Sequence, residues 1–169
     1  MADYNRWMNQ RFYEAACSLP EAEVRRDRGA FFGSILQTLN HIAVGDTIWL
    51  HRFSQHPEMS ALQTELLKFP QPSSLRQEIG SSMESLRTYR QALDEVIVRW
   101  SCSLTPEQLA STLTYRNMAG QPSSKIFSHL IQHFFNHQTH HRGQVSTLLF
   151  QAGVDVGVTD LLALIPNES

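Results

Sequence analysis

The sequence predicts an all-α protein, built as a four-helix bundle with long connections between the helices. Apolar residues recur every three or four positions through most of the 169 residues, which is the spacing of one helix face. Alternation with period two never extends beyond a few residues, so strands are expected to be minor. The length is that of one ordinary domain, and we expect residues 1–169 to form it.

The first two long helices are predicted over residues 3–18 and 34–53. Pro20 ends the first one, because proline cannot donate the backbone hydrogen bond that would continue it. The polar residues 21–29 then form a connector whose arginines we expect in solvent. Ser34 stands directly before an apolar run, as an N-cap residue does.

The third long helix is predicted over residues 74–101. Seven apolar residues from Ile79 to Trp100 follow one another at steps of three and four, which is typical of an amphipathic helix. Residues 54–73 contain three prolines and therefore predict a long connection, with one or two helical turns at 61–68.

The fourth long helix is predicted from residue 123 or 124 to residue 151. A short helix comes before it, because Thr105 can cap a helix that has Pro106 at its first position. Between the two helices, residues 111–122 predict a minor irregular or hairpin loop, with one β-favouring run at 112–115.

Composition and charge exclude several classes of protein. A formal net charge of −2 leaves no electrostatic footprint for nucleic acid or an anionic membrane. The sequence has no apolar run of membrane-spanning length, and its first residues lack the apolar core of a signal peptide. Cys17 and Cys102 stand apart from each other, which fits a reducing compartment. We therefore expect a cytoplasmic protein with neither nucleic acid nor membrane as partner.

Histidine is the unusual residue, since five of the eight histidines fall within residues 129–141. Residues four apart share a helix face, but the direction drifts by about 40° per step, so this series cannot converge on one point. Neighbouring apolar residues centre the buried arc on His137 and His141. His133 lies at the edge of the arc, whereas His129 and His140 lie further out.

Two inward-facing imidazoles four residues apart are typical of a metal site. An unsatisfied buried ring nitrogen costs roughly 1–3 kcal/mol, which coordination to a divalent cation removes. His41, on the inward face of the predicted helix 34–53, is the best third ligand. Hydrogen-bonded core histidines are the alternative. Gln138 follows His137, so the glutamate base of an H-E-x-x-H protease is missing.

Two polar residues near these histidines are candidates for a supporting role. Asp46 follows His41 by five positions, so it could lie beside the site as a base. It could also cap a helix or pair with an arginine, and we favour these two structural roles. Gln144 lies close to the direction of His137 and could orient that ring or a bound water molecule.

Three separated motifs resemble the DinB-like superfamily. They are HFFNHQTHHRGQ at residues 133–144, LNHIA at 39–43 followed by Asp46 and WLHR at 49–52, and YNRWMN at 4–9. The resemblance implies an up-down-down-up four-helix bundle in which His41, His137 and His141 hold a divalent metal ion, with zinc or nickel the usual occupant. Members are often dimeric, so it also implies a homodimer.

The resemblance also implies a class of activity. Characterised relatives are mostly transferases or isomerases that use a low-molecular-weight thiol such as bacillithiol, mycothiol or glutathione, and many others are described as metal-dependent hydrolases. We therefore expect a metal-dependent enzyme that activates a thiol or water toward a small-molecule substrate. The alternative is a non-catalytic, metal-stabilised bundle acting as a small-molecule-binding or stress-response interaction protein. An enzyme requires a pocket that leads to the metal, whereas the alternative predicts a closed site.

Overall fold

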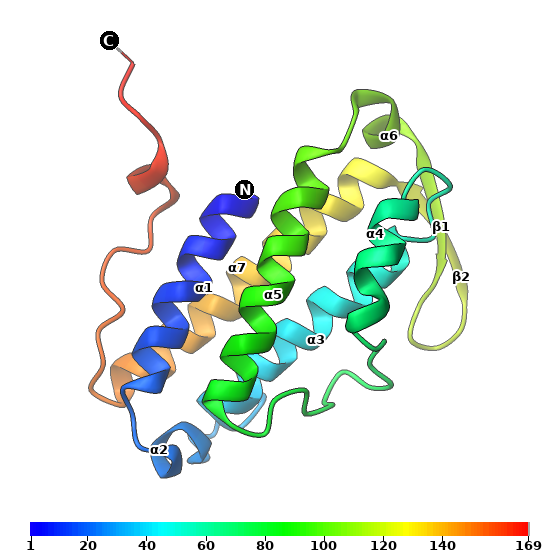
Figure 1. Cartoon of the computed structure of the whole chain (residues 1–169). Coiled ribbons are helices and arrows are strands. Elements are labelled where there is room, and N and C mark those ends of the chain that lie inside the picture. Colours follow the sequence, from blue (N-terminus) through cyan, green and yellow to red (C-terminus); the bar gives the residue numbers. More distant parts are fainter. Residues whose placement is uncertain (169) are drawn as a thin grey trace.

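The structure is a computed structural model that describes residues 1–168, and it is mostly helical, as predicted. Figure 1 shows the long helices running beside one another, with most of the shorter elements near their ends. The long helices are α1 (Ala2–Cys17), α3 (Ile35–Phe53), α5 (Met83–Cys102) and α7 (Phe127–Gln151). The shorter elements are α2 (Glu21–Arg25), α4 (Ser60–Glu65), the 3-10 turn η1 (Leu66–Lys68), α6 (Pro106–Ala110), strands β1 (Thr112–Arg116) and β2 (Pro122–Ile126), and the 3-10 turn η2 (Leu161–Leu164).

The long helices pack mainly in two pairs, α1 against α5 and α3 against α7, and the two pairs meet through α1–α7 and α3–α5 contacts. Their apolar side chains form two separate buried clusters, one around Phe53, Trp100 and Phe134 and the other around Phe12 and Ile42. On α3, α5 and α7, buried polar residues lie between the two clusters. Within residues 1–168, no helix is both long and apolar enough to cross a membrane.

Two helix starts, those of α3 and α6, follow the capping signals that the sequence carries. The Ser34 hydroxyl accepts a hydrogen bond from the Gln37 backbone N–H, so α3 begins where predicted. Thr105 and Gln108 cap each other reciprocally at the start of α6, with Pro106 in the first helical position. These local signals are reliable because each satisfies a backbone N–H that the helix itself leaves free.

The predicted start of the third long helix at residue 74 was wrong, because α5 begins at Met83. The Asn40 side chain of α3 accepts hydrogen bonds from the backbone N–H groups of Ile79 and Gly80 and donates one to the Gly80 carbonyl. These bonds hold the segment in an irregular path, and a Ser82–Ser85 capping box then starts the helix. A long-range side-chain contact therefore overrides the local helical pattern.

The predicted hairpin near residues 111–122 is present as a small two-stranded sheet, but its second strand runs further than predicted. β1 and β2 pair antiparallel, so residues 122–126, in part assigned to the fourth helix, form a strand and α7 begins at Phe127. Leu113 and Tyr115 of β1 are buried against the core. Polar and apolar side chains alternate only weakly over residues 122–126. Backbone pairing with β1 therefore determines that these residues form a strand.

The predicted polar connector after Pro20 is also partly helical. Residues Glu21–Arg25 form α2, and its Val24 side chain is fully buried. Arg28 does not point freely into solvent as expected, because its guanidinium pairs with Glu23 at 2.8 Å. Burial of the Val24 side chain stabilises α2, which is too short to show helical periodicity in the sequence.

Candidate metal centre

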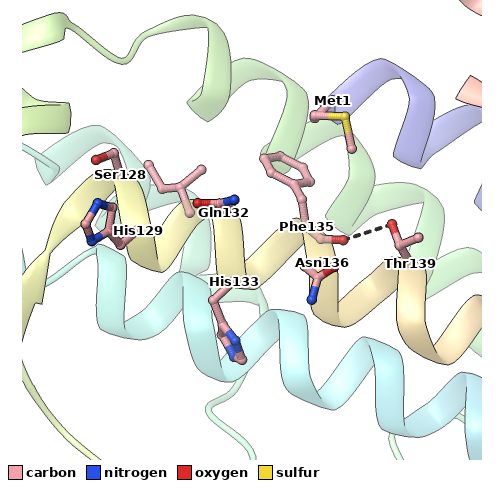
Figure 2. Close-up of a pocket in the computed structure, with 9 residues that line it drawn as sticks. Met1, Ser128, His129, Gln132, His133, Phe135, Asn136 and Thr139 are labelled. Atoms are coloured by element: carbon pink, nitrogen blue, oxygen red, sulfur yellow. Dashed lines mark hydrogen bonds between the residues drawn. The ribbon is translucent and has the colours of Figure 1, made fainter.

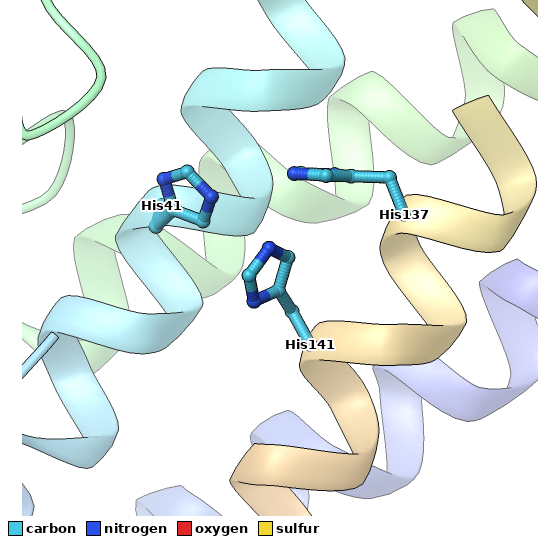
Figure 3. A group of neighbouring side chains, drawn as sticks. All are labelled: His41, His137 and His141. Atoms are coloured by element: carbon cyan, nitrogen blue, oxygen red, sulfur yellow. The ribbon is translucent and has the colours of Figure 1, made fainter. Parts of the chain in front are cut away.

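His41 of α3 and His137 and His141 of α7 converge in the contact between these two helices (Figure 3). Each offers one ring nitrogen, and these nitrogens all lie within 4.8 Å of one another. The ring centroids are 4.4 Å apart for His137–His141, 4.6 Å for His41–His141 and 5.3 Å for His41–His137. The structure therefore brings together the three histidines that the sequence singled out.

The His41 ring is held in one orientation by its surroundings. Its Nδ1 lies 3.1 Å from the backbone carbonyl oxygen of Leu75, and the Phe32 ring stacks on it with centroids 3.9 Å apart. A carbonyl oxygen can only accept, so Nδ1–H donates and the lone pair of a neutral ring is on Nε2. The loop before α5 thus selects the His41 tautomer suited to binding a cation.

The His141 ring is oriented in the same way by a residue of its own helix. Its Nδ1 lies 2.8 Å from Oε1 of Gln144, one turn further along α7. Donation to this oxygen leaves the Nε2 lone pair of His141 available. Gln144 therefore supports His141, whereas the sequence pointed to His137 or a water molecule.

His137 lies against a glycine of the facing helix. A Cβ atom placed on Gly45 would be 2.8 Å from Cε1 of His137, so only a residue without a side chain lets the ring occupy this position. The Nδ1 atom of His137 is buried and has no hydrogen-bond partner. The sequence reasoning missed Gly45, although a glycine inside an apolar helix is a signal for close packing.

The electrostatics of the three rings suit a cation. Burial lowers the pKa of His41, His137 and His141, and for His137 the neighbouring histidines lower it further, to about 3. All three rings are therefore neutral at neutral pH, which is the form that binds metal. Three neutral imidazoles, of which His137 has a buried nitrogen without a hydrogen-bond partner, fit a divalent ion such as zinc or nickel. Imidazole ligands do not discriminate between these two metals.

Asp46 lies outside this triad, in a buried polar network. Its Oδ2 accepts a hydrogen bond from Arg90 at 2.5 Å, Arg90 also pairs with Asp94 at 2.9 Å, and the Asn9 amide donates to Asp94. Burial raises the pKa of the Asp46 carboxyl to about 6, against the opposing effect of Arg90. Of the alternatives for Asp46, the structure shows the arginine pair.

The remaining histidines of α7 are exposed. The His133 ring lies 6.0 Å from that of His137 and packs on Trp49 at 5.1 Å. His140 contacts the Gln144 amide, and His129 contributes to an open groove of about 910 Å³ over α7, which Figure 2 shows with Met1 at one side. His133 and His140 each adjoin one ring of the triad, His137 and His141 respectively, without joining the group that could hold a metal.

A smaller cavity reaches one member of the triad, His41. It has a volume of about 130 Å³ and is lined by His41, Phe32 and Leu75, together with polar residues of the loop before α5. This space holds a few water molecules or a small chemical group. It lies on the side of His41 nearest the N-terminal end of α3.

Comparison with known proteins identifies the family of this chain. The sequence model of the DinB family matches residues 1–168. The chain belongs to the DinB family. Protein DinB of Bacillus subtilis (strain 168) is 28% identical over 159 residues, which cover 94% of this chain and 87% of that protein. The crystal structure of a DinB-like protein from Bacillus cereus ATCC 10987 shares the fold, with a TM-score of 0.52, 19% identity and 89% coverage of each chain.

Proposed function

We propose that this DinB-family protein is a metal-dependent enzyme that activates a thiol or a water molecule toward a small-molecule substrate, as a thiol S-transferase or a hydrolase. His41, His137 and His141 would hold the metal ion, with zinc or nickel as the occupant. The observation that carries the proposal is the convergence of three neutral imidazoles from two helices, two of them held with their Nε2 lone pairs free.

The residues of the chain prepare the site for such chemistry. A divalent cation bound by three neutral ligands keeps its full charge, and this charge lowers the pKa of a neighbouring thiol or water. Leu75 and Gln144 fix two of the rings, and Phe32 shields one face of His41 from water. Asp46 is already paired with Arg90, so the proton released from the nucleophile leaves to solvent or to the substrate.

The ligand assignment is tested by measuring bound metal in His137→Ala and His133→Ala. We expect about one zinc or nickel ion per wild-type chain, as three ligands on one centre imply. His137→Ala should lose it, whereas His133→Ala should retain it, because His133 lies outside the triad. Stoichiometric metal in His137→Ala would refute the assignment.

Catalysis is tested on the metal-loaded protein with several low-molecular-weight thiols and a chloronitrobenzene electrophile, and in parallel with nitrophenyl esters. We expect metal-dependent turnover of one substrate class and its loss in His137→Ala. Metal binding without turnover of any of them would favour the non-catalytic alternative, in which the cation only joins α3 to α7.

The finer architecture belongs to the same proposal. We propose that α1, α3, α5 and α7 form the up-down-down-up bundle of the family and that the protein is a homodimer. The α1–α5 and α3–α7 pairing supports the first statement. A crystal structure tests the helix order, and sedimentation analysis tests the dimer.

A further inference from the structure

A second cavity lies over the C-terminal half of α3, between this helix and the β-hairpin. Its volume is about 490 Å³, which is within the usual range for small-molecule sites. Arg52 of α3 and Arg116 of β1 both line it, together with several carboxamide side chains. None of the residues that line it is acidic, so its charge is positive.

Arg52 is the unusual group in this cavity, because it is buried but has no anionic partner. Only 9% of the residue is exposed, and within residues 1–168 its guanidinium forms no hydrogen bond or ion pair. It packs on the ring faces of Trp49, at 4.6 Å, and Tyr115, at 5.1 Å. These contacts stabilise the charge but give its N–H donors no acceptor in the protein.

The comparison with Arg90 shows how unusual this is. Arg90 is even more deeply buried than Arg52, and it is neutralised by two carboxylates at 2.5 and 2.9 Å. Burial lowers the pKa of Arg52, since no acidic group near it offsets the loss of hydration. A buried cation without a counter-ion is costly, and a ligand that brings a negative charge removes the cost.

The cavity lies on the same face of α3 as the metal centre. His41, Gly45, Ile48 and Arg52 fall within about 60° of one another around a helix of 3.6 residues per turn. At 1.5 Å per residue, Arg52 is about 16 Å along the axis from His41 and about 10 Å from Gly45, which packs on His137. This separation sets the length that a ligand would need in order to contact both sites.

We propose that this cavity is an anion subsite and that Arg52 binds a carboxylate of the small-molecule substrate or thiol. The planar guanidinium matches a carboxylate with two parallel hydrogen bonds, and the carboxamides around it can donate to the same oxygens. The link to the substrate depends on the proposed function. An extended chain spans about 3.3–3.6 Å per residue, so a ligand about three to five residues long would fit the separation.

The probe for this subsite is succinate, a thiol-free dicarboxylate, followed by NMR of the Trp49 indole N–H and the Arg52 Nε–H in zinc-loaded protein. We expect saturable shifts of both signals that weaken as salt is added. Arg52→Met should weaken binding by roughly tenfold or more, as for the loss of one charge-assisted hydrogen bond. The control is Arg26→Met, which removes the same charge from an exposed residue paired with Glu23, and it should bind as wild type.

Two further variants keep the test decisive if Arg52→Met does not fold. Arg52→Lys retains the charge but not the planar fork, and Arg116→Gln changes only the exposed side of the cavity; both should bind more weakly than wild type. Absence of a saturable shift in wild type, or equal losses in Arg52→Met and Arg26→Met, would overturn the proposal. Tighter binding of inorganic phosphate than of succinate would overturn the carboxylate assignment.

Metal-free protein separates this inference from the proposed function. The residues that line the cavity include none of the three histidines, so succinate should shift the Trp49 and Arg52 signals equally without zinc. If the anion binds and no substrate is turned over, the subsite stands and the proposed activity fails. Succinate shifts that require zinc would instead indicate binding at the metal and would overturn the subsite.

Discussion

Gly45 shapes the metal centre although it donates no ligand. It is in the middle of α3, where glycine costs about 1 kcal/mol of helix stability relative to alanine. The structure gives the reason for this cost, because the His137 ring occupies the space of the missing side chain. At the scale of single residues, the position of the His137 ring therefore depends on Gly45 having no Cβ atom.

This dependence predicts the effect of Gly45→Ala. The added methyl group should push the His137 ring aside, since the atom it meets is at the free end of a side chain. We expect the fold to be retained and the zinc affinity to fall by roughly tenfold or more, as for other residues that orient a ligand. Competition titration with a chromophoric chelator measures the affinity.

Gly143→Ala is the matched control for this experiment. Gly143 is on α7, two residues after His141, and a Cβ atom there would meet nothing within 4 Å. We expect unchanged zinc affinity and a gain of up to about 1 kcal/mol in the free energy of unfolding. Equal zinc affinities in the two variants would show that Gly45 does not position His137.

At the scale of elements, a buried ionic network joins three of the long helices. Arg90 of α5 pairs with Asp46 of α3 and with Asp94 of its own helix, and Asn9 of α1 donates to Asp94. The network lies between the two apolar clusters of the core, and its side chains are almost fully buried. It specifies how α1, α3 and α5 are aligned, because a shifted helix would leave a charge unpaired.

Arg90→Met tests this role. The substitution leaves two buried carboxylates without their counter-ion, and we expect a loss of about 3–5 kcal/mol in the free energy of unfolding. Urea denaturation measures the loss. Arg99→Met removes an exposed arginine from the same helix, which pairs with Glu65, and should cost at most about 1 kcal/mol. A similar loss in both variants would contradict a special role for the buried network.

At the scale of the whole molecule, metal binding should stabilise the fold, because the ligands join α3 to α7. The two helices are separated by residues 54–126 of the sequence, so the bound ion acts as a long-range link. A cation that binds only the folded state stabilises it by about 2.7 kcal/mol when present at one hundred times its dissociation constant.

The corresponding experiment compares thermal unfolding with zinc and with a chelator. We expect the chelator to lower the melting temperature of the wild type by several degrees, given about 2–4 °C per kcal/mol for a chain of this size. His137→Ala should melt at the same temperature in both conditions. A wild-type melting temperature that does not respond to the chelator would argue against a metal site in this protein.

The sequence by itself determined the mostly helical fold, the starts of α3 and α6, and the three histidines of the candidate site. Each of these follows from local chemistry: helical spacing of apolar residues, side chains that cap backbone N–H groups, and imidazoles four residues apart. His41 could be selected because it lies among the apolar residues of the predicted helix, beside Leu39 and Ile42.

Only the tertiary structure decided the late start of α5, the strand at Pro122–Ile126 and the surroundings of the histidines. Asn40, Leu75 and Gly45 act across contacts between segments far apart in the sequence, where spacing carries no information. The same holds for Asp46, whose partner Arg90 is on another helix. Local signals specify the elements and their inward faces, and packing between distant elements decides what each inward-facing side chain meets.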